Sequence, residues 1–234
     1  MILHGLSTIA LLALGPLSVY GTALGAVGCS HGLSAVLAGL SFFVFCDGWY
    51  FLDMAIYQLH LLVLPLPTKP RTDLVDTYVR HGRVSLGDID RNGHCNNARY
   101  LRECGFGRRD FWRANGVWAI LRAEGGNLVV GAQTVRYRRE LSLGQTYALE
   151  TRVLAWDDQA FYVEQRFVTR CKDGKQDFVH AIVYVKNNVL GRLRPSALVA
   201  KVAPGLSPPP IPDEVQLWIE SNLASSASLR PKTN

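Results

Sequence analysis

The sequence predicts an α+β protein in which a long helix packs on a curved antiparallel sheet of about five strands, preceded by an N-terminal membrane-spanning segment. The first 46 residues hold no acidic or basic side chain. Between 97 and 121, apolar side chains recur at helical three- and four-residue spacing. After Gly125 and Gly126 the period changes to the two residues of a strand, and short turns between strands imply antiparallel pairing.

Residues 1–64 are predicted to form a membrane anchor of one or two spans. Their only charged side chains are Asp47 and Asp53, whereas all 25 lysines and arginines lie from Lys69 onward. The hydrocarbon core of a bilayer is spanned by about 20 apolar residues. The candidate spans are residues 6–27 and 33–52. The alternative is a cleaved secretory signal, which would release the domain outside the cell. Such signals begin with basic residues, and the start of this chain has no lysine or arginine.

The distribution of cations also predicts orientation. The positive-inside rule places Lys69, Arg71 and the domain behind them in the cytosol. The five cysteines are an odd number and show no Cys-x-x-Cys spacing. We therefore expect neither a disulfide framework nor a metal site.

The folded domain is expected at residues 78–190, after a linker at 65–77 and before a proline-rich tail at 191–234. Prolines stiffen the linker because they fix φ and disfavour a helix before them. The tail is predicted to be extended and to end in a short helix at 214–226, capped by Asp213.

Within the domain, one helix precedes four consecutive strands. The long helix is expected at 97–121, with Asn96 or Asn97 as its N-cap. Strands are expected at residues 78–86, 127–141, 146–156, 160–171 and 177–188. A common core would form where the helix packs on the curved sheet.

The loop before the long helix is the densest polar cluster in the chain. Its side chains are those of Asp88, Asp90, Asn92, His94, Asn96 and Asn97. A helix N-terminus presents unpaired N–H groups and the positive end of the helix dipole, which would stabilise a carbonyl oxygen as it becomes an oxyanion. A nearby carboxylate could deprotonate a water molecule. The pattern therefore indicates a site for acyl transfer or hydrolysis.

Each of these side chains also has a structural interpretation. Asp88 suits an Asx turn, and Asp90 could equally shape or cap the loop. His94 could be a hydrogen-bonded structural histidine, because no metal-ligand spacing accompanies it. Asn96 and Asn97 suit helix capping.

The spacing Asp-x-Asp-x-Asn-x-His-x-Asn-Asn-x-x-Tyr, which begins at Asp88, resembles the signature of hotdog-fold acyl thioesterases, notably the plant fatty acyl-carrier-protein thioesterases. The stretch 137–140, Tyr-Arg-Arg-Glu, is similar to the Tyr-Arg-Arg-Glu-Cys stretch of those enzymes. Over roughly residues 47–230 the chain is similar to the animal thioesterase superfamily member 6 family of the 4-hydroxybenzoyl-CoA thioesterase-like superfamily. The matching stretches lie at 47–50, 97–103, 156–162 and 218–226.

This resemblance implies a hotdog fold, in which the sheet wraps the long helix and two subunits form a homodimer with active sites at their interface. It implies an acyl-CoA or another acyl thioester as substrate, with no cofactor. The catalytic residues that it implies are Asp90, Asn92, His94 and Glu140. In a water-mediated route Glu140 or Asp90 is the base, while His94 and Asn92 position the water. Amides near 96–98 would hold the thioester oxygen.

The predicted substrate-binding residues are Asn96, Asn97, Ala98 and Arg138. Arg136 and Arg138 share one strand face, which could meet the phosphates of coenzyme A or anionic headgroups; a solvated face is the alternative. The scattered arginines and the absence of a recognition motif argue against nucleic-acid binding.

Two functions remain after this reasoning. In the first, an anchored thioesterase hydrolyses fatty acyl-CoA at the cytosolic face of the endoplasmic reticulum membrane. In the second, the fold is an acyl- or lipid-binding module with little turnover that supports membrane lipid homeostasis. Leu141 favours the second, because it stands where the plant enzymes have cysteine and so excludes a thiol nucleophile there. Glu140, which could also be simply solvated, favours the first together with Asp90.

Overall fold

The protein divides into two compact units, Met1–Leu66 and Pro67–Asn234. Its structure, a computed structural model, describes residues 2–45, 48–63, 73–170 and 176–229. The proline-rich stretch of the predicted linker, 65–70, lies outside the described residues.

The first unit contains three helices. They are α1 (Ile2–Gly25), α2 (His31–Phe45) and α3 (Gly48–Val63). The phenol of Tyr20 and Nδ1 of His31 lie 2.8 Å apart and link α1 to α2. The candidate span at 33–52 is not a single helix, because α2 ends and α3 begins within it. Among the described residues no single helix is long and apolar enough for a candidate span, although α2 and α3 together meet that test as a bent pair.

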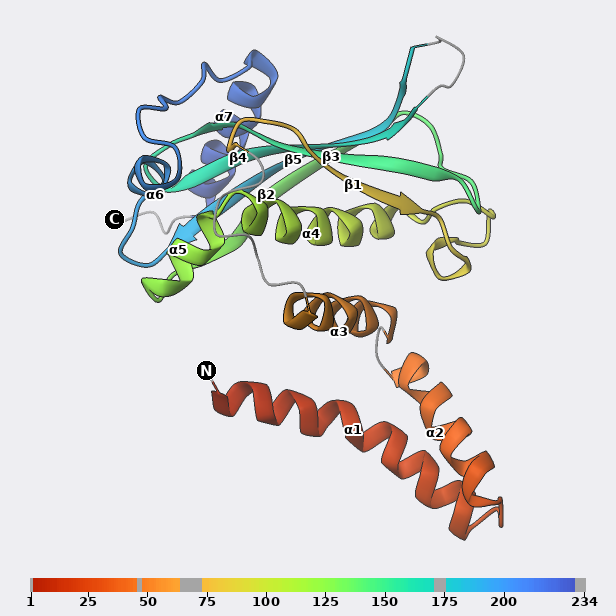
Figure 1. The fold of residues 1–234 in the computed structure, drawn as a ribbon. Coiled ribbons are helices and arrows are strands. Elements are labelled where there is room, and N and C mark those ends of the chain that lie inside the picture. Colours follow the sequence, from red (N-terminus) through yellow and green to blue (C-terminus); the bar gives the residue numbers. More distant parts are fainter. Residues whose placement is uncertain (1, 46–47, 64–72, 171–175, 230–234) are drawn as a thin grey trace. The chain divides into compact units, whose positions relative to one another are not determined.

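The second unit is built on an antiparallel sheet of five strands, as predicted. The strands are β1 (Tyr78–Arg83), β2 (Asn127–Tyr137), β3 (Thr146–Trp156), β4 (Ala160–Thr169) and β5 (Phe178–Leu190). Their order across the sheet is β1-β3-β4-β5-β2 (Figure 1). One end of the sheet therefore carries the end of β1, the β2–β3 turn and the β4–β5 connection, and we call it the loop end.

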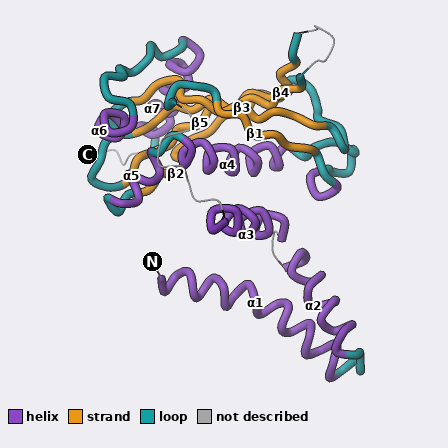
Figure 2. Tube along the Cα trace, in the orientation of Figure 1, coloured by secondary structure: helices purple, strands orange, loops and turns teal. Residues whose placement is uncertain are grey.

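Helices cover both faces of this sheet (Figure 2). The long helix α4 (Asn97–Ala114) lies on one face, and α7 (Asp213–Ser228) lies on the other (Figure 1). Side chains of β4 alternate between them, as a strand requires. The rings of Phe161 and Trp112 are 5.0 Å apart on the α4 side, and those of Tyr162 and Trp218 are 6.5 Å apart on the α7 side. The domain is thus α+β, with a long helix on an antiparallel sheet.

Gly107 explains how α4 can lie so close to the sheet. A Cβ atom at this position would lie 2.8 Å from Cδ2 of Leu149 and 3.0 Å from Nε2 of Gln165. Gly105, on the same helix, has nothing within 4 Å of its would-be Cβ. The glycine at 107 is therefore required by packing, whereas the one at 105 is not.

Several predicted boundaries differ from the structure. The helix predicted at 97–121 is two helices, because Gly116 has a φ of +82° and starts α5 (Val117–Ala123). The strand predicted to reach 141 ends at Tyr137. The tail is not wholly extended, since it forms α6 (Pro195–Val202), which buries Leu198 completely. The last helix begins at Asp213, which is not its cap; Pro212 is.

Candidate functional site

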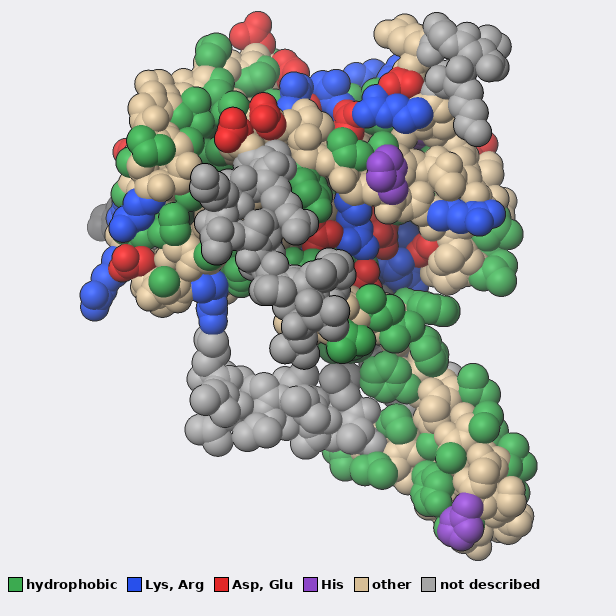
Figure 3. Space-filling model, in the orientation of Figure 1, with side chains coloured by type: hydrophobic (Ala, Val, Ile, Leu, Met, Phe, Trp, Pro, Cys, Tyr) green, Lys and Arg blue, Asp and Glu red, His purple; other side chains and the backbone are tan. Residues whose placement is uncertain are grey.

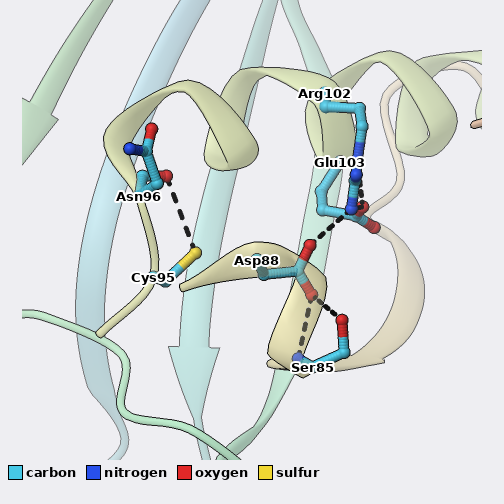
Figure 4. Close-up of polar contacts among 6 residues, drawn as sticks. All are labelled: Ser85, Asp88, Cys95, Asn96, Arg102 and Glu103. Atoms are coloured by element: carbon cyan, nitrogen blue, oxygen red, sulfur yellow. Dashed lines mark hydrogen bonds and ion pairs between the residues drawn. The ribbon is translucent and has the colours of Figure 1, made fainter. Parts of the chain in front are cut away.

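Asp88 links the polar loop to α4 (Figure 4). We call the side of the loop that carries Asp88 the inner side, and the side that carries Asp90, Asn92 and His94 the outer side. Asp88 as a whole residue is only 7% exposed. Its Oδ2 accepts hydrogen bonds from the amide and hydroxyl of Ser85, at 2.9 and 2.6 Å, and its Oδ1 accepts from Arg102 of α4. Its carbonyl oxygen accepts from the amide of Asn96 at 2.8 Å. Asp88 therefore has the turn-forming role and supports the loop.

Arg102 joins this support to a second carboxylate. Its guanidinium bonds both Asp88 and, at 3.1 Å, Glu103 (Figure 4). Burial raises the pKa of Glu103, while the neighbouring Arg102 acts in the opposite direction. No sequence pattern predicts this network, since the Asp88–Arg102 contact joins residues 14 positions apart.

The outer side of the loop gathers the predicted catalytic side chains. Oδ1 of Asp90 accepts a 2.8 Å hydrogen bond from the amide of Asn92, and the amide of Asp90 donates to the carbonyl of His94 at 3.1 Å. Nδ1 of His94 lies 4.0 Å from Oδ1 of Asp90, beyond hydrogen-bond distance. The side chains of Asp90 and His94 are 25% and 36% exposed. Solvent water can therefore reach a carboxylate, an imidazole and the Asn92 amide side chain within one tight turn.

The start of α4, which follows this turn in the chain, offers one open amide. Asn96 caps the helix as predicted, and its Oδ1 accepts the amide of Ala98 at 2.9 Å. The amide of Arg99 donates to the Asn96 carbonyl at 2.8 Å. Among the described residues no partner accepts the amide of Asn97. The predicted oxyanion donors at 96–98 are therefore reduced in this structure to Asn97, with the helix dipole behind it.

Glu140 directly precedes Leu141 and Ser142, whose backbones contact the site loop and the start of α4. The amide of Cys95 donates to the carbonyl of Leu141 at 2.8 Å, and the amide of Leu141 donates to the Tyr100 hydroxyl at 3.1 Å. His94 and Ser142 form an isolated antiparallel bridge. The Glu140 side chain is exposed at this junction, and in the described part of the chain it makes no hydrogen bond to Asp90 or His94. Its catalytic role stays a prediction.

Arg138 also lies at the loop end of the sheet. Its side chain is exposed, donates to the carbonyl of Val179 at 3.1 Å and stacks 5.2 Å from the ring centroid of Phe178. Arg139 stacks on the same ring at 4.0 Å. Sequence reasoning did not foresee that Phe178 would hold both guanidinium groups at the surface.

The thiols near the loop are not nucleophiles. Burial raises the pKa of Cys95 and of Cys104 to about 12, so both remain thiols at neutral pH. Leu141 is fully buried and contributes no reactive group. Within the described residues no group of His, Cys, Asp and Glu is arranged to hold a metal ion. A solvent-accessible carboxylate and imidazole just before a helix N-terminus are groups that can activate water and stabilise an oxyanion.

Comparison with known proteins places these residues within a family. Residues 84–219 match the family model of the thioesterase-like superfamily. The chain is 38% identical to the protein THEM6 of Danio rerio over 80% of its own length and 89% of that protein. It is 35% identical to THEM6 of Xenopus laevis, over 85% and 93% of the two chains. Among solved structures it is similar to the probable thioesterase YbaW from Escherichia coli, with 18% identity, a TM-score of 0.47, and 54% and 96% of the two chains covered.

Proposed function

The chain belongs to the thioesterase-like superfamily, and we propose that it hydrolyses an acyl thioester of the acyl-CoA type at the loop before α4. One observation carries the proposal. The loop holds Asp90, Asn92 and His94 in a solvent-accessible turn that ends three residues before Asn97, the first residue of α4, whose amide is open. Hydrolysis needs a base, a bound water and an oxyanion donor, and this arrangement supplies a candidate for each.

In the proposed reaction, the thioester carbonyl oxygen accepts a hydrogen bond from the Asn97 amide at the positive end of α4. Asp90, or Glu140, takes a proton from a water molecule that Asn92 and His94 position. The water oxygen attacks the carbonyl carbon, and the tetrahedral intermediate then collapses. The C–S bond breaks, and the proton passes to the leaving thiolate. No covalent intermediate is needed.

We also propose that two copies pair through β2. This strand runs for 11 residues at an edge of the sheet and pairs only with β5 in the described part of the chain. Most of its side chains are half-buried or exposed, and an unpaired edge is a template for another strand. A homodimer would cover this edge and bring residues of the partner toward the start of α4.

The proposed location is the cytosolic face of the endoplasmic reticulum membrane, with membrane lipid as a neighbour. The support is the charge distribution, with no cation before Lys69. Helices α2 and α3 together have the length and composition of a bent span. Arg138, exposed at the loop end, is proposed to meet the phosphates of coenzyme A.

A binding module with little turnover is the second candidate. Two observations favour it: the amide of Ala98 is already taken by Asn96, and Leu141 offers no nucleophile. With one open amide instead of two, the oxyanion would be held less strongly. Such a module would bind acyl-CoA in the same place and release it unchanged.

The full chain in detergent micelles, offered acyl-CoAs of several chain lengths, separates the two candidates. We expect hydrolysis that falls about 10²- to 10⁴-fold in Asp90→Ala, because a general base contributes that factor. Asp158→Ala is the matched control, since Asp158 is an exposed carboxylate in the β3–β4 turn at the other end of the sheet. Glu140→Ala tests the second base. Turnover that neither site variant lowers would contradict the assigned site, and saturable binding without turnover would favour the module.

A further inference from the structure

Two leucines project into solvent at the loop end of the sheet. Leu86, in the short 3₁₀ helix η1 (Leu86–Asp88), is 77% exposed, and Leu143, in the β2–β3 turn, is 47% exposed. Their backbones lie together, because the amide of Val84 donates to the carbonyl of Gln145 and the amide of Gly144 donates to the carbonyl of Val84. Leu86 also directly precedes the site loop.

Both leucines stand on backbone that the fold holds firmly. The turn of Leu143 is closed by the Ser142 amide, which donates to Oε1 of Gln145 at 3.0 Å. The 3₁₀ helix of Leu86 is closed by the bonds between Asp88 and Ser85. Single exposed leucines are common on protein surfaces, so exposure alone does not identify a binding surface. Here two are presented rigidly beside the same candidate site.

Basic side chains surround these leucines. Five arginines are exposed at the loop end; Arg170 is paired with Asp177 and Glu150, and the other four lie with two site carboxylates, those of Asp90 and Glu140. These four arginines are Arg83, Arg91, Arg138 and Arg139. Arg83 is tied to the turn of Leu143, since its Nε donates to the carbonyl of Gly144 at 2.9 Å. Hydrophobic and basic side chains are visible together where β1 ends (Figure 3).

We infer that a surface of Leu86, Leu143, Arg83, Arg91 and Arg139, which we call the rim, docks on a lipid bilayer that carries anionic headgroups. Leucine side chains enter the boundary between headgroups and acyl chains, and arginines meet lipid phosphates. Charge complementarity selects the bilayer over a second copy of this chain, because two rims facing each other would bring like charges together. The inference rests on the proposed function, since a docked rim would let an acyl thioester pass from the bilayer to the start of α4.

Fluorescence quenching in proteoliposomes tests the rim without any assay of turnover. The full chain, with Cys29, Cys46 and Cys171 replaced by serine, receives an environment-sensitive label at Leu86→Cys or Leu143→Cys. Two matched controls are Leu190→Cys, 48% exposed at the far end of β5, and Leu217→Cys, 66% exposed on α7. Vesicles of phosphatidylcholine, with or without phosphatidylserine, carry a spin-labelled lipid that quenches only a label inside the bilayer.

We expect quenching at 86 and 143 to exceed that at 190 and 217 at least about twofold, and to rise further with phosphatidylserine. Equal quenching at all four positions would overturn the inference. The inference would also be overturned if fluorescence at 86 and 143 changed with the amount of protein per vesicle but not with the quenching lipid. That result would mean that a second copy of the chain covers the rim. A chain that docks but does not hydrolyse would contradict the proposed function and leave the rim intact.

Activity gives a second readout. The double variant Leu86→Ser and Leu143→Ser changes no residue placed in the site, so hydrolysis of a short, water-soluble acyl thioester should equal that of the parent. Hydrolysis of a long-chain thioester presented in anionic vesicles should fall about tenfold, which is the effect of losing part of the apolar burial of two leucines. Equal loss on both substrates would contradict docking.

Discussion

The inner and outer sides of the site loop carry the same chemical group in opposite settings. On the inner side, the Asp88 side chain is 10% exposed and both of its oxygens accept hydrogen bonds, from Ser85 and from Arg102. On the outer side, Asp90 is 25% exposed, and its Oδ1 accepts the amide of Asn92 while facing His94 at 4.0 Å. Only two positions separate these carboxylates in the sequence.

The role of each carboxylate follows from how many of its hydrogen-bond acceptor positions are still unoccupied in the folded protein. An ionised carboxylate has about four such positions. Three donors approach Asp88, and its burial excludes water, so it can neither bind a reactant nor exchange a proton with one. Asp90 keeps acceptor capacity toward solvent. In this loop Asp88 therefore stabilises the fold, and Asp90 is left free to act on a reactant.

Removing the inner carboxylate should have the largest effect on stability. Asp88→Ala leaves the Ser85 amide and the Arg102 guanidinium without their partner, although Arg102 retains Glu103. Losing one side of a buried ion pair costs about 3 kcal/mol of unfolding free energy. Urea unfolding of the variant and the parent measures this, with the exposed Asp158→Ala as control. A loss below about 1 kcal/mol, the range of a surface pair, would show that Asp88 is not the support.

Helix α4 follows the site loop, and two of its glycines test how closely the helix packs on the sheet. In Gly107→Ala the new methyl would press on Leu149 and Gln165, so we expect a loss of about 1–3 kcal/mol. In Gly105→Ala the new methyl has no atom within 4 Å, so the better helix propensity of alanine should raise the free energy of unfolding by up to about 1 kcal/mol. Denaturant midpoints measure both. Equal effects of the same sign would contradict the close approach at Gly107.

A buried histidine contacts the backbone of Glu140, the second candidate base, and gives the comparison a pH-dependent test. His180 is 3% exposed; its Nδ1 lies 3.1 Å from the Glu140 carbonyl, and its Nε2 lies 3.3 Å from the amide nitrogen of Gln145. The hydroxyl of Thr169 lies 2.8 Å from the same Nε2 and can donate to it, as the Gln145 amide nitrogen does, so a neutral ring that donates from Nδ1 and accepts at Nε2 satisfies all three contacts. Burial lowers the pKa of His180 accordingly.

The sign of the resulting pH dependence follows. The unfolded chain takes up the proton near pH 6.5, whereas the folded chain takes it up only at lower pH, so acid favours unfolding. Stability should be complete above about pH 6.5 and fall below it by at most about 1.4 kcal/mol per pH unit until the folded pKa is reached. Urea unfolding between neutral and mildly acidic pH measures the slope. His180→Gln should reduce it, and an unchanged slope would assign the titration elsewhere.

Local patterns were enough to predict the sheet and the helix start. The alternation along β3, bounded by turn residues, predicted its ends correctly, and Asn96 was identified as a cap because capping depends on neighbouring residues. The ends of other elements depend on packing. Leu198 of α6 is buried in the core, and Pro195 in the first turn of this helix is a local start signal that the prediction of an extended tail overlooked.

The candidate site was predictable as a group of residues but not as a geometry. The motif identified Asp90, Asn92 and His94, which the structure does bring into one turn. Which amide of the helix start stays open could not be read from sequence, because it depends on the side-chain orientation of Asn96. The contact between Asp88 and Arg102 joins a loop to the second turn of a helix, and only the fold creates it.

A single turnover in isotopically labelled water tests the central claim most directly. The full chain in excess over an acyl-CoA is mixed in water enriched in heavy oxygen, and the released fatty acid is analysed by mass. If Asp90 acts as a base on water, the first turnover places one heavy oxygen in the fatty acid and none in the protein, and Asp90→Asn releases almost no acid. Unlabelled fatty acid with heavy oxygen in a site carboxylate would contradict the account. So would release equal to that of the parent by both Asp90→Asn and Glu140→Gln.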